Sequence, residues 1–436
     1  MRKGMGMVVA ALLLAGCGGR SEAPGQPDDG LSGPKQLCTT PAGDWQRLDP
    51  AALELDAAKL QDALDWANLH TGLSVAVYRH GCMAMQSRLD SMTANVPLDG
   101  WSMTKTVVAL LVGRAVTLGL VKLDEPIGRF YPEADAEHAR LTLRQLMTET
   151  AGMQVNYLRE LNPAMPDRVQ DALSLPFEHE PGSTWEYAQT VVDLTLNVVE
   201  RAAGRDVQEF AQQELFDPLG IQQGAYIWQR DRAGNSLGYA HLWMRNQDWA
   251  KLGHLMLWGG QWNGQRLIST DYLRQMRTRV PDNPAYGFLV WLNGGGWWRV
   301  PAVEGPDSGE GSVIPSGPDD LYAFVGIGEQ RIWIIPSLDL VIVRTGERGS
   351  QELDTRVTAF SGRAGQIDWE IPRRVLLAVK DAGYVDPGPY QSAGLVLPPA
   401  DDGIIGDAFE LQQVMAGLGL GPLSPEACSL FGCTAP

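Results

Sequence analysis

The sequence has little positive charge, cysteine or histidine, and each shortage argues against a class of function. Its 436 residues hold 35 lysines and arginines against 52 aspartates and glutamates, a net charge of −17. A nucleic-acid-binding surface needs clustered basic residues, so we expect no nucleic-acid partner. The five cysteines and six scattered histidines show no spacing typical of a zinc ligand set, so no metal site is predicted. We also expect no cofactor.

Long apolar runs are scarce as well. After the first 16 residues, no segment stays apolar over the roughly 20 residues that a membrane-spanning helix requires. At the N-terminus a short basic start precedes an apolar stretch, 7–15, which is typical of a signal peptide. The stretch ends in Leu14-Ala-Gly-Cys17, which resembles the processing box of bacterial lipoproteins. We therefore expect residues 1–16 to be a signal peptide, Cys17 to carry lipid and 17–45 to include a flexible tether.

Such an export signal predicts a lipid-anchored protein of the bacterial cell envelope, on the periplasmic side, with the outer membrane as the expected anchor point. The alternative is an ordinary signal peptide in which the cysteine is incidental. Disulfides form in this oxidising compartment, and four other cysteines are present. Of their three pairings, Cys38 with Cys82 and Cys428 with Cys433 is the most local. The sequence indicates no particular oligomeric state.

Strand patterns occur near both ends of the chain, and helical patterns fill the middle. The expected strands are residues 73–78, 82–86, 321–325, 330–335 and 340–345. Helical periodicity is found over 56–70 and 369–382, and it dominates from about 105 to 275. The pattern predicts an α+β fold: an antiparallel sheet built from both ends of the chain, flanked by helices, with an inserted helical subdomain. We expect one domain over 46–385 and a peripheral tail over 386–436.

The tetrad Ser102-Met-Thr-Lys105 opens an apolar helical pattern that ends near Gly119. Positions i and i+3 share one face of a helix, so the Ser102 hydroxyl and the Lys105 amine are expected side by side. Serine becomes a nucleophile when a neighbouring base accepts its proton, and burial lowers the pKa of a lysine toward that of a useful base. The alternative is a capping serine and a lysine that reaches the surface. A second such tetrad, at 32–35, lies in a Gly/Pro-rich segment that cannot be helical.

Three aromatic residues are further candidates for the site. Tyr187 lies on a loop before a helix that begins near residue 193, and a tyrosine there can relay protons if a neighbouring cation lowers its pKa. Tyr286 and Trp291 lie close to flexible glycines and are candidates for an apolar substrate pocket or lid. The alternative for all three is packing in the core. His241 is interpreted as structural.

Glycines open the late strand and make its start a candidate neighbour of the serine. Gly326 and Gly328 allow close backbone approach to a ligand, so both are candidate substrate contacts. A backbone N–H of Glu329 or Gln330, together with that of Ser102, is the predicted oxyanion hole. The alternative is a flexible strand start.

Taken in order, these motifs resemble the serine β-lactamase and penicillin-binding-protein superfamily. The most similar branch holds class C β-lactamases, D-amino-acid peptidases, related esterases and 6-aminohexanoate-dimer hydrolase. The resemblance extends over about 50–385 and implies the fold of that superfamily. Ser102-Met-Thr-Lys105 resembles the nucleophile motif, and Tyr187-Ala-Gln189 falls where the branch has Tyr-x-Asn. Further similar segments are 123–128, 141–147, 150–152 and 248–253.

Two departures from the family pattern bear on function. Gln189 stands where the family has an asparagine that contacts the lysine and the substrate amide, so the resemblance implies a substrate-binding role for Gln189. The family's strand motif is Lys or His, any residue, then Gly, whereas Gly326 or Ile327 takes the place of the cation here. In β-lactam enzymes that cation helps to receive the substrate carboxylate. Its absence favours an amide or ester hydrolase.

The sequence therefore predicts a serine hydrolase that cleaves a small amide, ester or peptide substrate through an acyl-enzyme, with Ser102, Lys105 and Tyr187 as catalytic residues. A Gly-x-Ser-x-Gly elbow is missing at Ser102, which argues against an α/β-hydrolase. A peptidoglycan D,D-carboxypeptidase or a β-lactamase is the alternative enzyme. A non-catalytic envelope binding protein that retained the fold is the alternative from another class, although such a protein has no need for the intact catalytic set.

Overall fold

The computed structural model describes residues 35–70, 72–162, 165–301, 307–346, 352–353, 365–391, 395–396 and 433–434. The predicted signal peptide, Cys17 with its predicted lipidation, most of the tether, Cys428 and most of the tail lie outside these residues. Within the described ranges, no helix combines the length and the apolar character needed to span a membrane.

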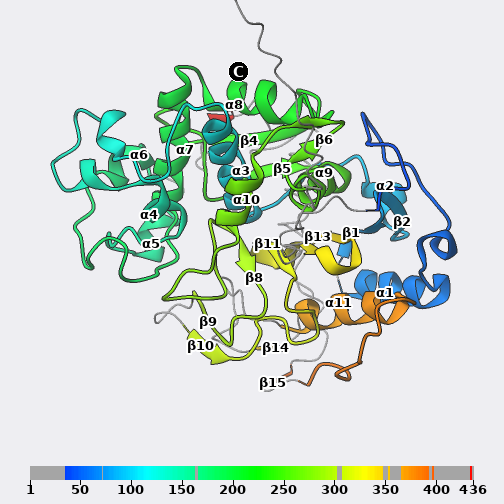
Figure 1. The fold of residues 1–436 in the computed structure, drawn as a ribbon. Helices are drawn as coiled ribbons and strands as arrows, with labels where there is room; N and C mark the ends of the chain where they lie inside the picture. The colour runs from blue at the N-terminus through cyan, green and yellow to red at the C-terminus, as the bar shows by residue number, and fades with distance from the viewer. Residues whose placement is uncertain are drawn as a thin grey trace, which may run out of the picture.

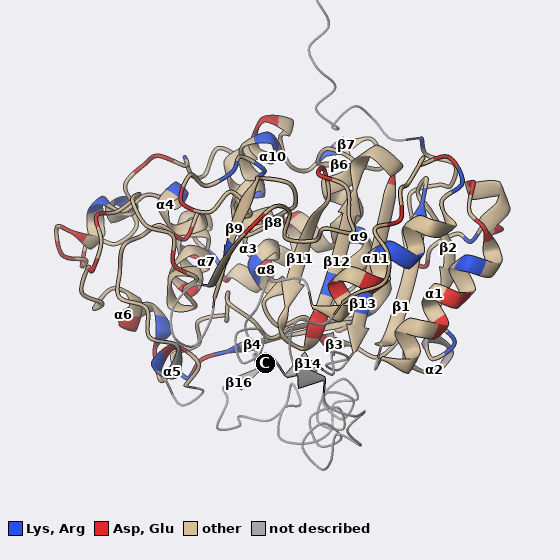
Figure 2. Cartoon of the chain, turned by 90° about the horizontal axis from the view of Figure 1, so that it is seen from below, with Lys and Arg blue, Asp and Glu red and all other residues tan. Residues whose placement is uncertain are grey.

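A six-stranded antiparallel sheet forms the centre of the molecule (Figure 1). Its strand order is β2-β1-β13-β12-β11-β8, and Figure 2 shows these strands side by side in that order from right to left. The strands are β1 (Gly72–Arg79), β2 (Cys82–Gln86), β8 (Trp291–Leu292), β11 (Tyr322–Gly326), β12 (Gln330–Ile335) and β13 (Leu340–Gly346). Because β1 pairs directly with β13, the two ends of the chain complete one sheet. The α+β prediction is confirmed.

Helices cover both faces of this sheet. Helices α1 (Ala57–Leu69) and α11 (Gln366–Ala378) pack together on one face, and α3 (Met103–Thr117) and α9 (Asn246–Leu257) pack on the other. Strand residues point alternately to the two faces, so Val75 and Val77 of β1 join the α1/α11 core while Ala76 and Tyr78 join the opposite one. The buried helix α3 thereby lies against β11, and the turn that carries Ser102 adjoins the end of that strand.

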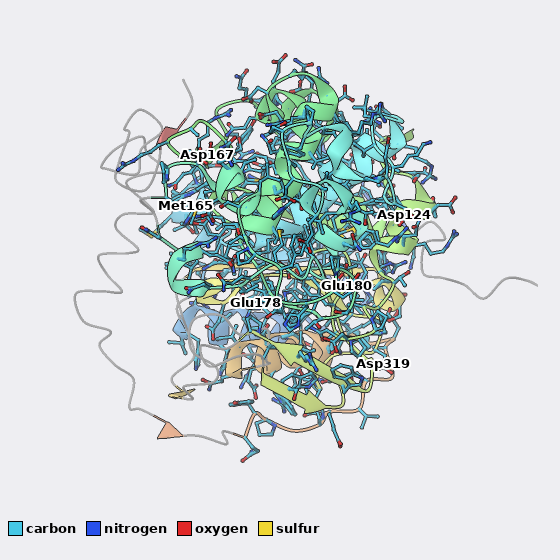
Figure 3. The ribbon with its side chains drawn as sticks, turned by 90° about the vertical axis from the view of Figure 1, so that its left-hand side faces the viewer. Asp124, Met165, Asp167, Glu178, Glu180 and Asp319 are labelled. Carbon is cyan, nitrogen blue, oxygen red and sulfur yellow. A yellow bond between two sulfur atoms is a disulfide. The ribbon has the colours of Figure 1, made fainter. Side chains whose placement is uncertain are left out.

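The chain between β2 and β8 is mainly helical. Its remaining helices are α2 (Asp90–Thr93), α4 (Leu143–Met147), α5 (Tyr157–Glu160), α6 (Arg168–Ala172), α7 (Thr190–Ala203), α8 (Val207–Ala211) and α10 (Thr270–Met276). Figure 3 looks onto this region, where Asp124, Asp167, Glu178 and Glu180 lie among the outer side chains. These carboxylates contribute to the net negative charge of the chain.

Short strands also occur inside and beyond the predicted helical stretch. A second small sheet has the order β16-β4-β5-β3 and places residues near the C-terminus against the helical region. Its strands are β3 (Leu98–Asp99), β4 (Tyr226–Arg230), β5 (Leu242–Met244) and β16 (Cys433–Thr434). The other short strands are β6 (Gln261–Trp262), β7 (Gln265–Arg266), β9 (Trp297–Val300), β10 (Asp307–Glu310), β14 (Glu352–Leu353) and β15 (Leu395–Val396). The domain limits 46–385 and 386–436 stay predictions.

A disulfide joins Cys38 to Cys82 and ties the N-terminal segment to β2. The bond is one of the two pairs in the most local pairing, and its Cα atoms are 5.3 Å apart. The second pair stays a prediction, since Cys428 lies outside the described residues.

Candidate active site

A tight turn from β3 into α3 fixes the position of Ser102. Its first residue, Gly100, leaves no space for a side chain, because a Cβ there would lie 2.2 Å from the Trp249 ring. The next residue, Trp101, has a left-handed backbone (φ 46°), and its N–H donates to Asp99 Oδ1 at 2.8 Å. Ser102 follows as the N-terminal flanking residue of α3. The serine hydroxyl therefore lies at the positive end of a buried helix, where developing negative charge is stabilised.

Lys105 is held at hydrogen-bonding distance from the serine. Its Nζ lies 3.2 Å from Ser102 Oγ, 2.5 Å from Gln189 Oε1 and 2.9 Å from the Tyr239 carbonyl oxygen. The side chain is 1% exposed, and this burial lowers its pKa from 10.5 to about 8. A carbonyl oxygen and an amide oxygen can only accept, so a neutral Lys105 donates its two hydrogens to them. Its lone pair is then left to face the Ser102 hydroxyl.

Buried charges surround this lysine. Glu149, Asp193 and Glu160 raise the pKa of Lys105, and Arg168 lowers it, although burial remains the largest influence. Asp193 and Arg168 form an ion pair at 2.5 Å. The Glu160 carboxylate instead accepts the backbone N–H of Gln189 at 2.5 Å. That bond anchors the start of α7, and with it the amide oxygen that contacts Lys105.

The structure brings Tyr187 and the two candidate pocket aromatics together. The Tyr187 ring centre lies 4.6 Å from Lys105 Nζ, 6.3 Å from the Tyr286 ring and 6.0 Å from the Trp291 ring. Trp185 packs against all three rings and completes a buried cluster. All four aromatic residues belong to the core on the α1/α11 side of the sheet, so their role in a substrate pocket stays a prediction.

The end of β11 lies directly against the turn that carries the serine. A Cβ on Gly326 would lie 2.2 Å from the Gly100 carbonyl oxygen and 3.2 Å from Trp101 Cβ, so only glycine allows this approach. Gly328 and Glu329 have left-handed backbones (φ 68° and 60°) and form the turn into β12. Gly326 thus adjoins the Ser102 turn, while Glu329 lies further along in the connection between strands.

Gln330 has a structural contact of its own. Its side chain is buried, and its Oε1 accepts the Gly346 N–H at 2.9 Å, which ties β12 to β13. The roles of the Glu329 and Gln330 backbone amides in an oxyanion hole stay predictions.

Two arginines lie behind this turn. Arg331 forms two 2.7 Å bonds to Asp368 and donates to the Gly326 carbonyl oxygen at 2.6 Å. Arg344 donates to the Glu329 carbonyl oxygen at 2.8 Å. Both side chains are buried and directed at the backbone of the turn. They therefore stiffen the strand connection and are not placed as exposed receptors for a substrate carboxylate.

Several contributors to the site escaped sequence reasoning. Glu149, Glu160, Asp193 and Arg168 surround Lys105 but belong to no recognisable spacing, and the Tyr239 carbonyl is a backbone group without a sequence signal. His241, interpreted as structural, bonds Asp99 at 2.7 Å, and its ring lies 4.8 Å from Trp101.

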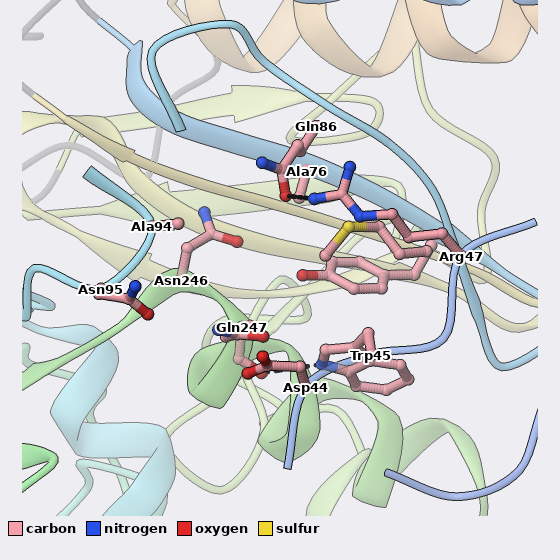
Figure 4. A pocket seen from close by; sticks show the side chains of 11 residues that line it. Asp44, Trp45, Arg47, Ala76, Gln86, Ala94, Asn95, Asn246 and Gln247 are labelled. Atoms are coloured by element: carbon pink, nitrogen blue, oxygen red, sulfur yellow. Dashed lines mark hydrogen bonds between the residues drawn. The ribbon is translucent and has the colours of Figure 1, made fainter. Parts of the chain in front are cut away.

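A cavity of about 340 Å³ lies elsewhere (Figure 4). It is lined by residues of the 44–47 segment, the β1–β2 hairpin and the start of α9, with Arg47 bonded to Gln86 across it. None of the predicted site residues lines this cavity.

The beta-lactamase family model matches residues 58–357, which is more than half of the chain. The chain therefore belongs to the beta-lactamase family, a family of serine hydrolases. The match includes every predicted catalytic and substrate-binding residue, from Ser102 to Gln330.

Individual proteins are also similar to parts of this chain or to its fold. Esterase EstB of Burkholderia gladioli is 30% identical over 217 residues, which are 41% of this chain and 55% of the esterase. The chain spans between 41% and 55% of the length of the first curated relatives it matches. A family VIII carboxylesterase has a similar fold, with a TM-score of 0.55, 15% identity and coverage of 74% of this chain and 97% of that one. A candidate 6-aminohexanoate-dimer hydrolase from Bacillus anthracis has a TM-score of 0.54, 14% identity and coverage of 72% and 85%.

Proposed function

We propose that the protein is an exported, lipid-anchored serine hydrolase that cleaves an ester or amide bond through an acyl-enzyme. The contact between Lys105 Nζ and Ser102 Oγ, at 3.2 Å, carries this proposal. The acceptors that hold the lysine leave its lone pair to face the serine. At pH 7 a lysine with a pKa of about 8 is neutral in about one molecule in ten, against about one in 3,000 for an ordinary lysine.

The reaction follows from the positions of these groups. Ser102 Oγ bonds to the substrate carbonyl carbon, its proton moves to Lys105 Nζ, and the carbonyl electron pair moves onto the oxygen. The backbone N–H of Ser102, with that of Glu329 or Gln330, stabilises this oxyanion. Tyr187 relays a proton to the departing alcohol or amine, which leaves an acyl group on the serine. Water then attacks the acyl carbon and gives a proton to the same groups. Ser102 Oγ leaves the carbon and takes that proton back, which restores the free enzyme.

The surroundings favour a substrate with an uncharged, apolar acyl group. Aromatic rings pack beside Tyr187, and the end of β11 carries glycine where β-lactam enzymes carry a cation. The relative EstB is an esterase, which also favours ester substrates. A D,D-carboxypeptidase or β-lactamase activity is favoured by membership of the family, and a beta-lactamase of Escherichia coli is also a relative, 27% identical over 128 residues. The intact set of Ser102, Lys105 and Tyr187 argues against a purely binding role.

The disulfide between Cys38 and Cys82 supports an extracytoplasmic location, because such bonds persist in oxidising compartments. The box that ends at Cys17 is the basis for proposing a lipid anchor. Globomycin treatment of cells that express the full chain tests the anchor. We expect unprocessed precursor to accumulate, whereas unaltered processing would contradict lipidation.

Turnover of p-nitrophenyl butyrate and of penicillin G by the chain without residues 1–17 tests the activity. We expect ester hydrolysis that Ser102→Ala reduces at least a thousandfold, with little penicillin turnover. Ser32→Ala is the matched control, because it removes the serine of the second Ser-x-x-Lys tetrad. Ester hydrolysis that survives in Ser102→Ala would refute the proposed site, and efficient penicillin turnover would favour the alternative enzyme.

A further inference from the structure

Two residues beside the Ser102–Lys105 pair have left-handed backbones, which side chains rarely adopt. Trp101, which precedes Ser102, has φ 46°, and His241 has φ 65°. Such a backbone costs free energy in any residue but glycine, and it is kept only where the surroundings hold it. Here the carboxylate of one residue, Asp99, bonds both of them.

Asp99 is the last residue of β3 and is 1% exposed. Its Oδ1 accepts the Trp101 N–H at 2.8 Å, and this bond to the second residue after it shapes the turn into α3. Its Oδ2 lies 2.7 Å from His241 Nδ1. Because a carboxylate only accepts, Nδ1 carries the hydrogen and donates it. A single buried carboxylate therefore joins the turn that carries the serine to the 239–242 segment.

The 239–242 segment supplies one of the groups that hold Lys105. The Tyr239 carbonyl oxygen, two residues before His241, accepts from Lys105 Nζ at 2.9 Å. At the other end of the segment, the Leu242 carbonyl oxygen accepts the Gly100 N–H at 3.0 Å. His241 lies between these two anchors, so its bond to Asp99 helps to set where the Tyr239 carbonyl lies relative to the serine turn.

The place of that carbonyl decides where the lysine lone pair points. A neutral amine has two hydrogens and one lone pair. The lone pair faces Ser102 Oγ while Gln189 Oε1 and the Tyr239 oxygen accept the two hydrogens. When the carbonyl moves away, the amine is free to turn and the lone pair no longer faces the serine.

His241 is not itself placed as the base. Its ring lies 4.8 Å from the Trp101 ring and 5.6 Å from the Tyr239 ring, and within the described residues no hydrogen bond joins it to Ser102 or Lys105. Its contribution therefore comes through the residues that it holds.

We propose that Asp99 and His241 form a positioning pair that keeps the Lys105 amine aimed at the Ser102 hydroxyl. The proposal rests on the proposed function. Neither residue exchanges a proton with the substrate. The pair acts by holding the serine turn and the Tyr239 carbonyl in a fixed relation, which gives His241 a task beyond packing.

Glycine and asparagine at position 241 separate this role from relief of backbone strain. Glycine adopts the left-handed backbone freely but has no side chain to bond Asp99. Asparagine also tolerates that backbone, and its amide nitrogen can take the place of Nδ1 and donate to Asp99. We expect kcat/KM for p-nitrophenyl butyrate to fall about tenfold to a hundredfold in His241→Gly and to stay within about threefold of wild type in His241→Asn.

The fold is expected to survive the loss of the Asp99 bond. Asp193 Oδ1 accepts the N–H groups of Gly238 and Tyr239 at 2.7 Å and 3.2 Å, so the 239–242 segment keeps another anchor. Urea unfolding of each variant checks this expectation.

Asn263→Gly is the matched control. Asn263 also has a left-handed backbone (φ 47°), but it is exposed in the turn between β6 and β7, so its kcat/KM should equal that of wild type. A wild-type kcat/KM in folded His241→Gly would overturn the proposal. Equal losses in His241→Gly and His241→Asn would also overturn it, because the donor to Asp99 would then make no difference.

Asp99→Ser tests the same bond from the other side and serves if His241→Gly fails to fold. The shorter hydroxyl can still accept the Trp101 N–H but does not reach His241. We expect a similar fall in kcat/KM, and no further fall when His241→Gly is added, because both changes remove one bond. A wild-type kcat/KM in folded Asp99→Ser, or losses that multiply in the double variant, would contradict the pair. Failure of the proposed function is read separately, from ester hydrolysis that survives in Ser102→Ala.

Discussion

At the scale of single residues, burial and the neighbours of Lys105 convert an ordinary lysine into a base. Lys105 has neutral hydrogen-bond partners and almost no contact with solvent, so its charged form is disfavoured. The oxygens of Gln189 and Tyr239 orient the amine, and nearby carboxyl groups keep its pKa from falling further. Ser102 lies within hydrogen-bonding distance of this base because it immediately precedes the first turn of α3.

The pH dependence of the wild-type enzyme follows from this lysine. Below its pKa of about 8, Lys105 carries a proton and cannot accept one from Ser102. Above that pH it is neutral and can act. We therefore expect kcat/KM for p-nitrophenyl butyrate to rise with pH and to reach half its plateau near pH 8. A profile that is flat from pH 6 to pH 9 would contradict a lysine base.

Spacing predicted this pair of residues, but not the groups around it. An i, i+3 relation on an apolar helix start is visible in the sequence, and so is the glycine that lets β11 approach. The carboxyl groups of Glu149, Glu160 and Asp193, which raise the pKa of Lys105, come from separate parts of the chain: the turn after α4, α5 and α7. A contact of that kind depends on tertiary packing, and the Tyr239 carbonyl has no side-chain identity to recognise.

At the level of elements, the strands and helices with strong patterns were predicted well. β2 and β12 have the predicted bounds, and Asp56 caps α1 with bonds to two of its first backbone amides. β4 and β5 were missed, because each is short and lies within a long stretch of helical pattern. β5 pairs with β4 on one side and with β3, which is far away in the sequence, on the other.

Adding one methyl group at Gly326 tests how closely β11 approaches the turn that carries Ser102. In Gly326→Ala the new Cβ would lie 2.2 Å from the Gly100 carbonyl oxygen, so the strand and the turn must separate. We expect a loss of about 1–3 kcal/mol in the free energy of unfolding and at least a tenfold fall in kcat/KM. Urea unfolding and ester turnover measure the two effects. Gly43→Ala is the control, because a Cβ there meets nothing within 4 Å. Equal behaviour of the two variants would contradict the close approach.

At the scale of the whole molecule, the central sheet contains strands from both ends of the chain. The disulfide between Cys38 and Cys82 ties the N-terminal segment to β2. Cys38 and Cys82 enclose a loop with a sequence separation of 44 residues. Restricting the unfolded chain by such a loop stabilises the fold by about 2–4 kcal/mol. We expect the double variant Cys38→Ser/Cys82→Ser to unfold at lower urea concentration and to be insensitive to dithiothreitol. Equal stability of wild type with and without reductant would contradict the bond.

The central claim is that Ser102 forms an acyl-enzyme, and intact mass with peptide mapping tests it most directly. The chain without residues 1–17 is mixed with p-nitrophenyl butyrate and quenched in acid within the first turnovers. The account predicts one added butyryl group, located on the peptide that contains Ser102 and missing from Ser102→Ala. Acylation that persists in Ser102→Ala, or that maps to another residue, would contradict the account.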